Sequence, residues 1–199
     1  MTIDYYFAPN SPFVYLGHAR FTAIAKAAGA TVRVLPIDLG KVFSVSGGLP
    51  LGKRAPQRQA YRLLELPRWS QRLGVPLNPQ PRFFPVAADD AARLIIAVDQ
   101  HDGTDAAMAL IAAVTQAVWA QERNIADADT LAALLAEQGL APTRLDDARK
   151  PEVQARYEAN TQRAIDAGVF GAPSYVVDGE LFWGQDRLDF VERRLRSPH

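Results

Sequence analysis

The sequence predicts an α/β protein in which a block of helices is inserted into a small unit of strands and helices. Three observations carry this prediction. A strand, helix, strand pattern opens the chain, alanine- and leucine-rich segments with helical spacing occupy its middle, and a hairpin signal followed by a helix closes it. Because the β-like segments lie at the two ends, we expect one folding unit with an insertion rather than two separate domains.

The composition limits the classes of function. The 199 residues suffice for one substantial core, and 22 basic against 22 acidic side chains argue against coating nucleic acid or an anionic membrane. The chain has no cysteine, which excludes disulfides and protein-thiol redox chemistry. Its three histidines show no metal-ligand spacing. The opening residues predict a strand with no basic segment before an apolar run, and no stretch approaches 18 consecutive apolar residues. We therefore expect a cytoplasmic protein without a metal, a nucleic-acid partner or a membrane partner.

The first 37 residues carry the opening pattern. Residues 2–7 and 31–37 are rich in β-branched and aromatic types, which predicts two short strands. Between them, apolar residues recur at three- and four-residue intervals from Phe13 to Ala28, and Gly29 is the predicted helix stop. The crossover is long enough for the two strands to pair in parallel.

The middle of the chain is predicted to be mostly helical. Residues 43–56 indicate a loop, because they contain a Gly-Gly pair and two prolines, and residues 57–73 indicate a helix despite Pro67. Alanine and leucine then dominate, which favours helices. Four more helices are therefore expected, at residues 87–100, 105–122, 127–138 and 151–167.

The C-terminal segment returns to β-structure. Residues 174–177 and 180–183 are expected to form a hairpin across Asp178-Gly179, a dipeptide typical of tight turns. Residues 186–195 then predict a last helix, which Asp186 or the residue before it would cap.

Ser11 and Pro12 stand where the first strand gives way to the first helix. A serine at this position can accept a hydrogen bond from a first-turn N–H, and proline suits the first helical position, so capping alone explains both residues. A helix N-terminus also stabilises an anion, to which Ser11 could donate its hydroxyl. The residues alone leave both interpretations open.

Two motifs near the C-terminus also have a structural and a functional interpretation. Pro173 could simply begin an edge strand after a trans bond, but glycines flank the Ala172-Pro173 pair, which indicates tight packing or the close approach of another backbone. Asp186 could cap the last helix, or it could offer a carboxylate to an amine.

Basic side chains gather in residues 53–72, which contain a single acid, Glu65. They indicate a solvated helix face, a binding surface for a carboxylate or, as the weakest alternative, a nucleic-acid contact. Trp69, Phe83 and Phe84 could pack an aromatic ligand or belong to the core. The basic residues are Lys53, Arg54, Arg58, Arg62, Arg68 and Arg72.

A resemblance to a known family rests on three segments and on the helical block between them. The segments are SPFVYLG at 11–17, RW at 68–69 and GVFGAPSYVVDGELFWGQDRLDFVERRL at 168–195. They resemble the bacterial 2-hydroxychromene-2-carboxylate isomerases, relatives of kappa-class glutathione transferases, over essentially the whole chain. The resemblance implies a thioredoxin-like fold of the DsbA type, with its thioredoxin-like part at 1–42 and 168–199 and a large helical insertion at about 43–167. It also implies glutathione as the cofactor and a homodimer.

The resemblance also implies roles for single residues. Ser11 stands where a DsbA-type oxidoreductase has the first cysteine of its C-x-x-C motif, so it is the expected catalytic residue and would hydrogen-bond the sulfur of glutathione. Pro173 matches the family's cis-proline, and the backbone of Ala172 would pair with the cysteinyl part of glutathione. Asp186 and Arg187 match an acidic-basic pair whose carboxylate would hold the γ-glutamyl ammonium end.

Substrate contacts are expected from Arg58, Tyr61 and Trp69, around a small aromatic carboxylate. Arg58 replaces a common lysine of the family, and Gly48 stands where the family has an asparagine. The implied reaction interconverts 2-hydroxychromene-2-carboxylate and trans-o-hydroxybenzylidenepyruvate in aromatic hydrocarbon catabolism, by reversible addition of the glutathione thiolate. The alternatives are a kappa-like glutathione transferase and a non-catalytic thioredoxin-like module that binds peptides.

Overall fold

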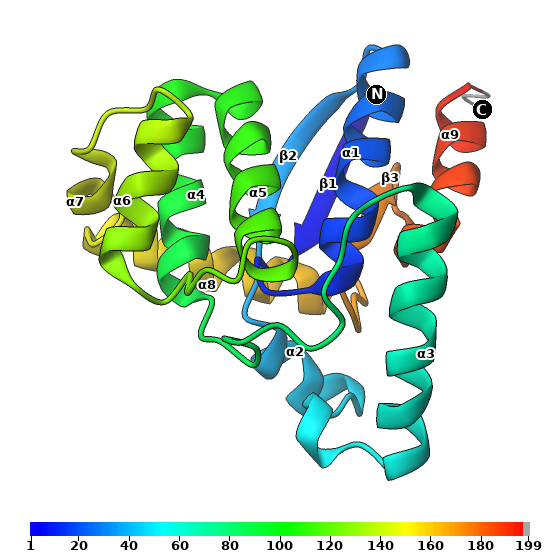
Figure 1. Ribbon diagram of the computed structural model, residues 1–199. Coiled ribbons are helices and arrows are strands. Elements are labelled where there is room, and N and C mark those ends of the chain that lie inside the picture. The colour runs from blue at the N-terminus through cyan, green and yellow to red at the C-terminus, as the bar shows by residue number, and fades with distance from the viewer. Residues whose placement is uncertain (197–199) are drawn as a thin grey trace.

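A four-stranded mixed sheet lies at the centre of the chain, in a computed structural model that describes residues 1–196 (Figure 1). Its strands are β1 (Thr2–Phe7), β2 (Thr31–Pro36), β3 (Ser174–Val177) and β4 (Glu180–Trp183). The order across the sheet is β2-β1-β3-β4; β1 pairs in parallel with β2, as predicted, and the other two pairings are antiparallel. Asp178 and Gly179 have φ of 48° and 82°, which the predicted tight hairpin turn requires.

Helices connect the strands and cover both faces of the sheet. They are α1 (Pro12–Ala27), α2 (Leu39–Ser46), α3 (Pro56–Leu73), α4 (Asp89–Asp102), α5 (Thr104–Trp119), α6 (Ala128–Glu137), α7 (Arg144–Asp147), α8 (Pro151–Asp166) and α9 (Leu188–Arg196), with 3-10 turns η1 at Leu51–Lys53 and η2 at Gln185–Arg187. Within residues 1–196, no helix combines the length and the apolar character that a membrane span needs.

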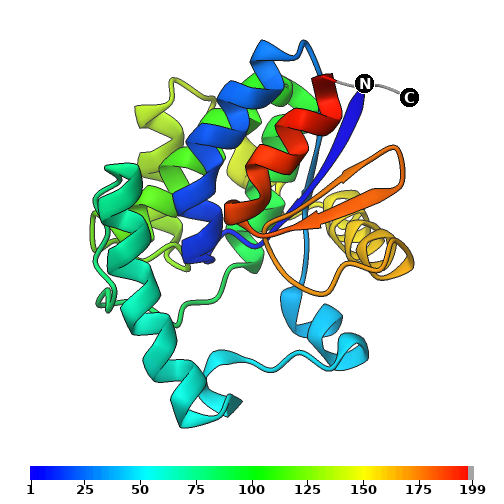
Figure 2. The ribbon, with the colours of Figure 1, turned by 90° about the vertical axis from the view of Figure 1, so that its right-hand side faces the viewer.

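Alternation along β1 divides the core between the two faces of the sheet. Ile3, Tyr5 and Phe7 are fully buried in the larger core, which α1, α4, α5 and α9 also build. Tyr6 points the other way and packs in a smaller core with Ala164 of α8. Figure 2 shows α1 and α9 side by side on one face, with α8 beyond the sheet.

The expected loop at residues 43–56 is wrong in its first part, because α2 extends to Ser46. The Asp38 side chain caps this helix by accepting the Lys41 N–H at 3.1 Å, and Val42 anchors it in the smaller core. Gly47 ends it with a left-handed φ of 76°. The Gly-Gly signal therefore marks the end of a short helix, which is held by one cap and one buried side chain.

The C-terminal helix begins later than predicted. Residues Gln185–Arg187 form the 3-10 turn η2, and α9 starts at Leu188. The Asp186 side chain forms no capping bond at η2 and pairs with Arg187 instead. Residues 197–199, which belong to the predicted C-terminal thioredoxin-like part, lie outside the described residues.

Candidate functional site

The strand pairings bring three loops to one end of the sheet. Tyr6, near the end of β1, pairs with Ser174 at the start of β3, and Ser174 pairs with Trp183 at the end of β4. The segments that follow β1 and β4 and the segment that precedes β3 therefore meet there, and the Gly184 N–H donates to the carbonyl of Pro173 at 2.9 Å. These segments carry Ser11, the Ala172-Pro173 pair and Asp186.

Ser11 is the N-cap of α1, with extended backbone angles and 9% of its surface exposed. Its Oγ accepts the N–H of Val14 at 3.3 Å, which confirms the capping interpretation. Because Oγ is the acceptor in that bond, the hydroxyl proton stays available for a second partner. The capping role and the anion-binding role are therefore compatible at this residue.

The N-terminus of α1 is a favourable place for negative charge. The helix has 16 residues, begins with Pro12 and carries no acidic residue in its first turn. The partial positive charge of the helix end is thus not neutralised from within α1. An anion in contact with the Ser11 hydroxyl would gain both the hydrogen bond and the dipole.

The Ala172–Pro173 peptide bond is cis, which confirms the prediction made for this proline. Ala172 is partly buried, and no described residue hydrogen-bonds to its N–H or its carbonyl. Its backbone is therefore open to pairing with an extended peptide-like ligand beside the start of β3.

Tight packing explains the glycine before this pair. A Cβ on Gly171 would lie 2.3 Å from Nε1 of Trp183, so only glycine leaves room for the indole ring. The same ring contacts Phe170 with 4.8 Å between the ring centroids. The aromatic pair therefore covers the chain just ahead of the cis bond.

Asp186 and Arg187 form an ion pair with 2.8 Å between Nη1 and Oδ2, and both side chains are more than a third exposed. Asp186 also lines a cleft of about 390 Å³ between α1, α3 and the C-terminal segment. Trp69 of α3 lies in the same cleft, where its Nε1 donates to Glu65. The full lining comprises Arg20, Ile24, Trp69, Arg72, Asp186, Asp189 and Glu192.

The three predicted substrate residues do not lie together. Arg58 and Tyr61 are exposed on α3, and neither lines the cleft that contains Trp69. A second cleft, of about 480 Å³, lies between α3 and residues 79–85, and Arg62 is the α3 arginine that lines it. The basic cluster of the sequence included Arg62, but nothing in the spacing distinguished it from its neighbours.

A long-range contact that the sequence could not reveal joins this second region to Ser11. The Asn10 side chain donates to the carbonyl of Val86 at 2.8 Å. Asn10 directly precedes Ser11, and Val86 directly follows residues 79–85. The wall of the second cleft is thus fixed beside the N-terminus of α1.

Phe43 occupies the space beside Gly48, where the resemblance places an asparagine. A Cβ on Gly48 would lie 2.2 Å from the Phe43 ring, so a side chain enters only if the ring moves. The Arg54 guanidinium lies 5.7 Å from the centroid of the same ring. An aromatic ring next to an arginine therefore replaces the amide of the family pattern.

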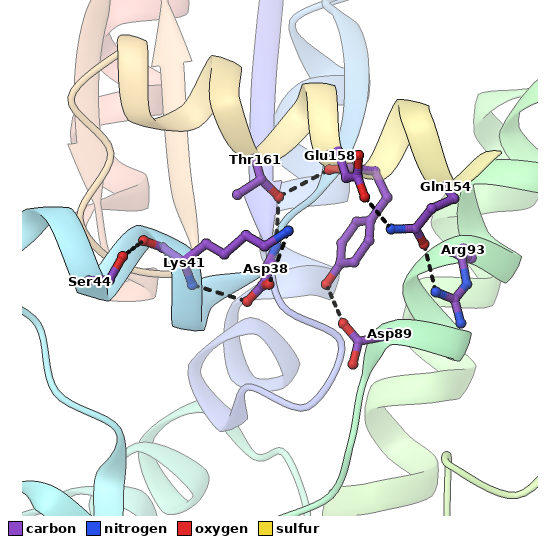
Figure 3. Close-up of polar contacts among 9 residues, drawn as sticks. Asp38, Lys41, Ser44, Asp89, Arg93, Gln154, Glu158 and Thr161 are labelled. Carbon is purple, nitrogen blue, oxygen red and sulfur yellow. Dashed lines mark hydrogen bonds and ion pairs between the residues drawn. The ribbon is translucent and has the colours of Figure 1, made fainter. Parts of the chain in front are cut away.

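Polar contacts along α8 hold α2 and α4 in place (Figure 3). The Thr161 hydroxyl accepts the Asp38 N–H at 2.9 Å, just before α2. One and two turns earlier on α8, Tyr157 donates to Asp89 at 3.2 Å, and Gln154 accepts from Arg93 of α4 at 2.7 Å. These contacts fix the segment that leads to Gly48 against the body of the protein.

Comparisons with known proteins agree with this geometry. The DSBA-like thioredoxin domain family matches residues 2–196. A solved structure of a 2-hydroxychromene-2-carboxylate isomerase is similar with a TM-score of 0.82 at 28% identity, over 98% of this chain and 95% of that one. The predicted DsbA-type thioredoxin-like fold is thereby confirmed.

Curated relatives extend the agreement to sequence. The glutathione S-transferase kappa 1 of Caenorhabditis elegans is 25% identical over 98% of this chain and 91% of its own length. A 2-hydroxychromene-2-carboxylate isomerase of Sphingobium xenophagum is 31% identical over 98% of this chain and 97% of its own length. The chain therefore belongs to the DSBA-like thioredoxin domain family and, within it, to the 2-hydroxychromene-2-carboxylate isomerase family.

Proposed function

We propose that this chain is a glutathione-dependent isomerase that interconverts 2-hydroxychromene-2-carboxylate and trans-o-hydroxybenzylidenepyruvate. Membership of the isomerase family supports the reaction class. The observation that carries the proposal is the Ser11 hydroxyl, which caps α1 and keeps its proton for a ligand at the end of the sheet where the cis Ala172–Pro173 bond lies. The substrate would be a small aromatic carboxylate.

The residues at this end of the sheet fit glutathione. The Ser11 hydroxyl would donate to the sulfur, and the N–H and carbonyl of Ala172, which hydrogen-bond to no residue within 1–196, would pair with the cysteinyl backbone. Asp186 and Arg187 present opposite charges, which suit the ammonium and the carboxylate of the γ-glutamyl end. The kappa-class relative is named a glutathione S-transferase, which supports the same ligand.

When bound, glutathione supplies a thiolate that adds reversibly to a conjugated carbon, so that a double bond becomes a single bond about which the substrate can rotate. The chain's part is to favour the ionised sulfur: Ser11 donates a hydrogen bond to it, and the N-terminus of α1 contributes its dipole. Because the serine is buried, bulk water competes little for that hydrogen bond. The sequence of steps leaves the oxidation state of the substrate unchanged.

A kappa-like glutathione transferase is the second candidate, because a kappa-class enzyme is among the curated relatives. The two reactions differ in the fate of the thiol. An isomerase returns free glutathione after each turnover, whereas a transferase consumes it in a stable conjugate.

The test is to record ultraviolet spectra of 2-hydroxychromene-2-carboxylate with the purified protein over time, with and without reduced glutathione, and to measure free thiol at the end. We expect faster conversion to the open isomer only with glutathione, and full recovery of the thiol. Loss of thiol in step with substrate would support the transferase instead. No conversion and no glutathione binding would favour the peptide-binding module.

A further inference from the structure

Arg62 lies on the side of α3 that faces the second cleft, between that helix and residues 79–85. Its guanidinium carbon is 5.0 Å from the centroid of the Phe84 ring and 5.5 Å from that of Trp119. Within residues 1–196, no acidic side chain pairs with it, and its Nη2 is buried without a hydrogen bond. The faces of these two rings thus stabilise the guanidinium charge by cation–π contacts. Because no carboxylate neutralises it, the charge can still pair with an anion.

The charge of Arg62 persists over the whole neutral range. Burial, together with the nearby charge of Arg54, lowers the pKa of Arg62 to about 10. At neutral pH the group is therefore still protonated. It is a constant cation in a partly desolvated place, where a carboxylate gains more from a charge-assisted hydrogen bond than it would in water.

The rest of the cleft suits an aromatic ring. Its volume is about 480 Å³, and apolar or proline side chains make up much of its lining, with Leu51, Leu63 and Phe84 among them. None of the described residues that line it is acidic. Two arginines line it, Arg62 and Arg82, and burial lowers the pKa of Arg62. A cavity of this size with apolar walls and cations on its lining fits a small molecule that has an aromatic body and a negative end.

The wall of the cleft is linked to the segment where the proposed chemistry takes place. Residues 84–86 run directly from the cleft wall to the carbonyl that accepts the Asn10 side chain. Asn10 is the residue before Ser11. One hydrogen bond therefore joins the segment that follows the cleft wall to the chain segment that carries the serine hydroxyl.

We propose that Arg62 binds the carboxylate of an aromatic acid in this cleft. That this acid is the substrate rests on the isomerase function proposed above, whereas its binding does not. Glutathione also has carboxylates, but the apolar lining around Arg62 favours an aromatic acid over a polar tripeptide. Arg62 would then be the residue that orients the substrate, in place of the exposed Arg58.

Isothermal titration with trans-2-hydroxycinnamate, without glutathione, tests the proposal directly. We expect Arg62→Gln to raise the Kd of this acid by about 10-fold to 100-fold, the range typical of a lost hydrogen-bonded charge contact. The Kd of Arg62→Lys should lie between those of the wild type and Arg62→Gln, because lysine keeps the charge but lacks the planar guanidinium. The amide of the same acid should bind the wild type weakly and should not discriminate between the variants.

The matched control is Arg149→Gln, which removes an arginine that is 68% exposed and far along the chain from the cleft. Its Kd for the acid should equal that of the wild type. The same Kd in Arg62→Gln as in the wild type, or no binding by the wild type at millimolar acid, would overturn the proposal. A loss confined to glutathione affinity would also overturn it, because the anion would then be the tripeptide. Since the titration needs no turnover, failure of the isomerase assay leaves its result intact.

Discussion

At Ser11 one hydroxyl can serve both the helix and the ligand, and two substitutions separate these roles. Replacing Ser11 by alanine removes the cap, at a cost of about 1 kcal/mol in stability, together with the donor. Replacing it by glycine costs only a few tenths of a kcal/mol but removes the same donor. We expect both variants to lower turnover of 2-hydroxychromene-2-carboxylate by roughly 100-fold, the loss typical of one donor to a reacting anion. Steady-state rates and urea unfolding of both variants provide the comparison.

The contradicting result is just as specific. If Ser11→Gly turns over at the wild-type rate with the wild-type pH profile, the serine acts only as a cap. If Ser11→Ala lost activity and Ser11→Gly kept it, the effect of alanine would come from the helix end and not from the sulfur.

His18 is a buried, neutral histidine of α1, about two turns after Ser11. Its Nε2 lies 2.8 Å from the carbonyl of Met108, so this nitrogen carries the proton, and Nδ1 accepts from the Tyr5 hydroxyl at 3.2 Å. Burial outweighs the Met108 contact and lowers the pKa of His18 to about 4, compared with 6.5 for an unperturbed histidine. Both ring nitrogens are occupied within the core, which indicates a structural role.

This burial predicts how stability depends on pH. Because the unfolded chain takes up the His18 proton near pH 6.5 and the folded chain only near pH 4, acidification between these values favours unfolding. By pH 5 the wild type should lose about 2 kcal/mol through this group. His18→Gln does not titrate and should lose correspondingly less between pH 7.5 and pH 5. Urea unfolding at both pH values provides the measurement, and equal losses in the two proteins would contradict it.

At the scale of elements, the sequence predicts a helix or turn correctly where neighbouring residues alone determine it. The Asp178-Gly179 hairpin depends on two residues that accept positive φ, and its turn forms as predicted. The sequence alone missed α2, because its stability comes from the Asp38 cap and from Val42 in a core that residues far along the chain complete. Helical spacing outweighed a single local breaker at Pro67, because α3 continues through this proline as predicted.

The candidate site divides in the same way. Ser11 and the cis bond before Pro173 could be predicted because each lies in a short motif, at a helix start or a strand start. Arg62 could not be separated from its neighbours, because its difference lies in Phe84 and Trp119 beneath it, which come from other parts of the chain. The fold creates that environment, and α3 alone does not encode it.

At the scale of the whole molecule, α3 exposes two large apolar side chains that nothing in residues 1–196 covers. The helix packs against α1 on one side, and its end near Pro56 extends beyond the body of the protein (Figure 1). On its outer side, Tyr61 is 57% exposed and Leu64 is 55% exposed, one turn apart. Exposed apolar side chains that lie together on one helix face can form part of a surface that another protein covers.

We expect a second copy of this chain to cover that surface in a homodimer. Light scattering after size exclusion should give about twice the 21.8 kDa of one chain. A twofold axis places each substitution in the interface twice, so Leu64→Glu should shift the mass to that of one chain without loss of secondary structure. Phe190→Glu, on α9, replaces an apolar side chain that is 45% exposed and should leave the dimer intact. A monomeric wild type would refute the dimer, and a monomer produced only by Phe190→Glu would move the interface from α3 to α9.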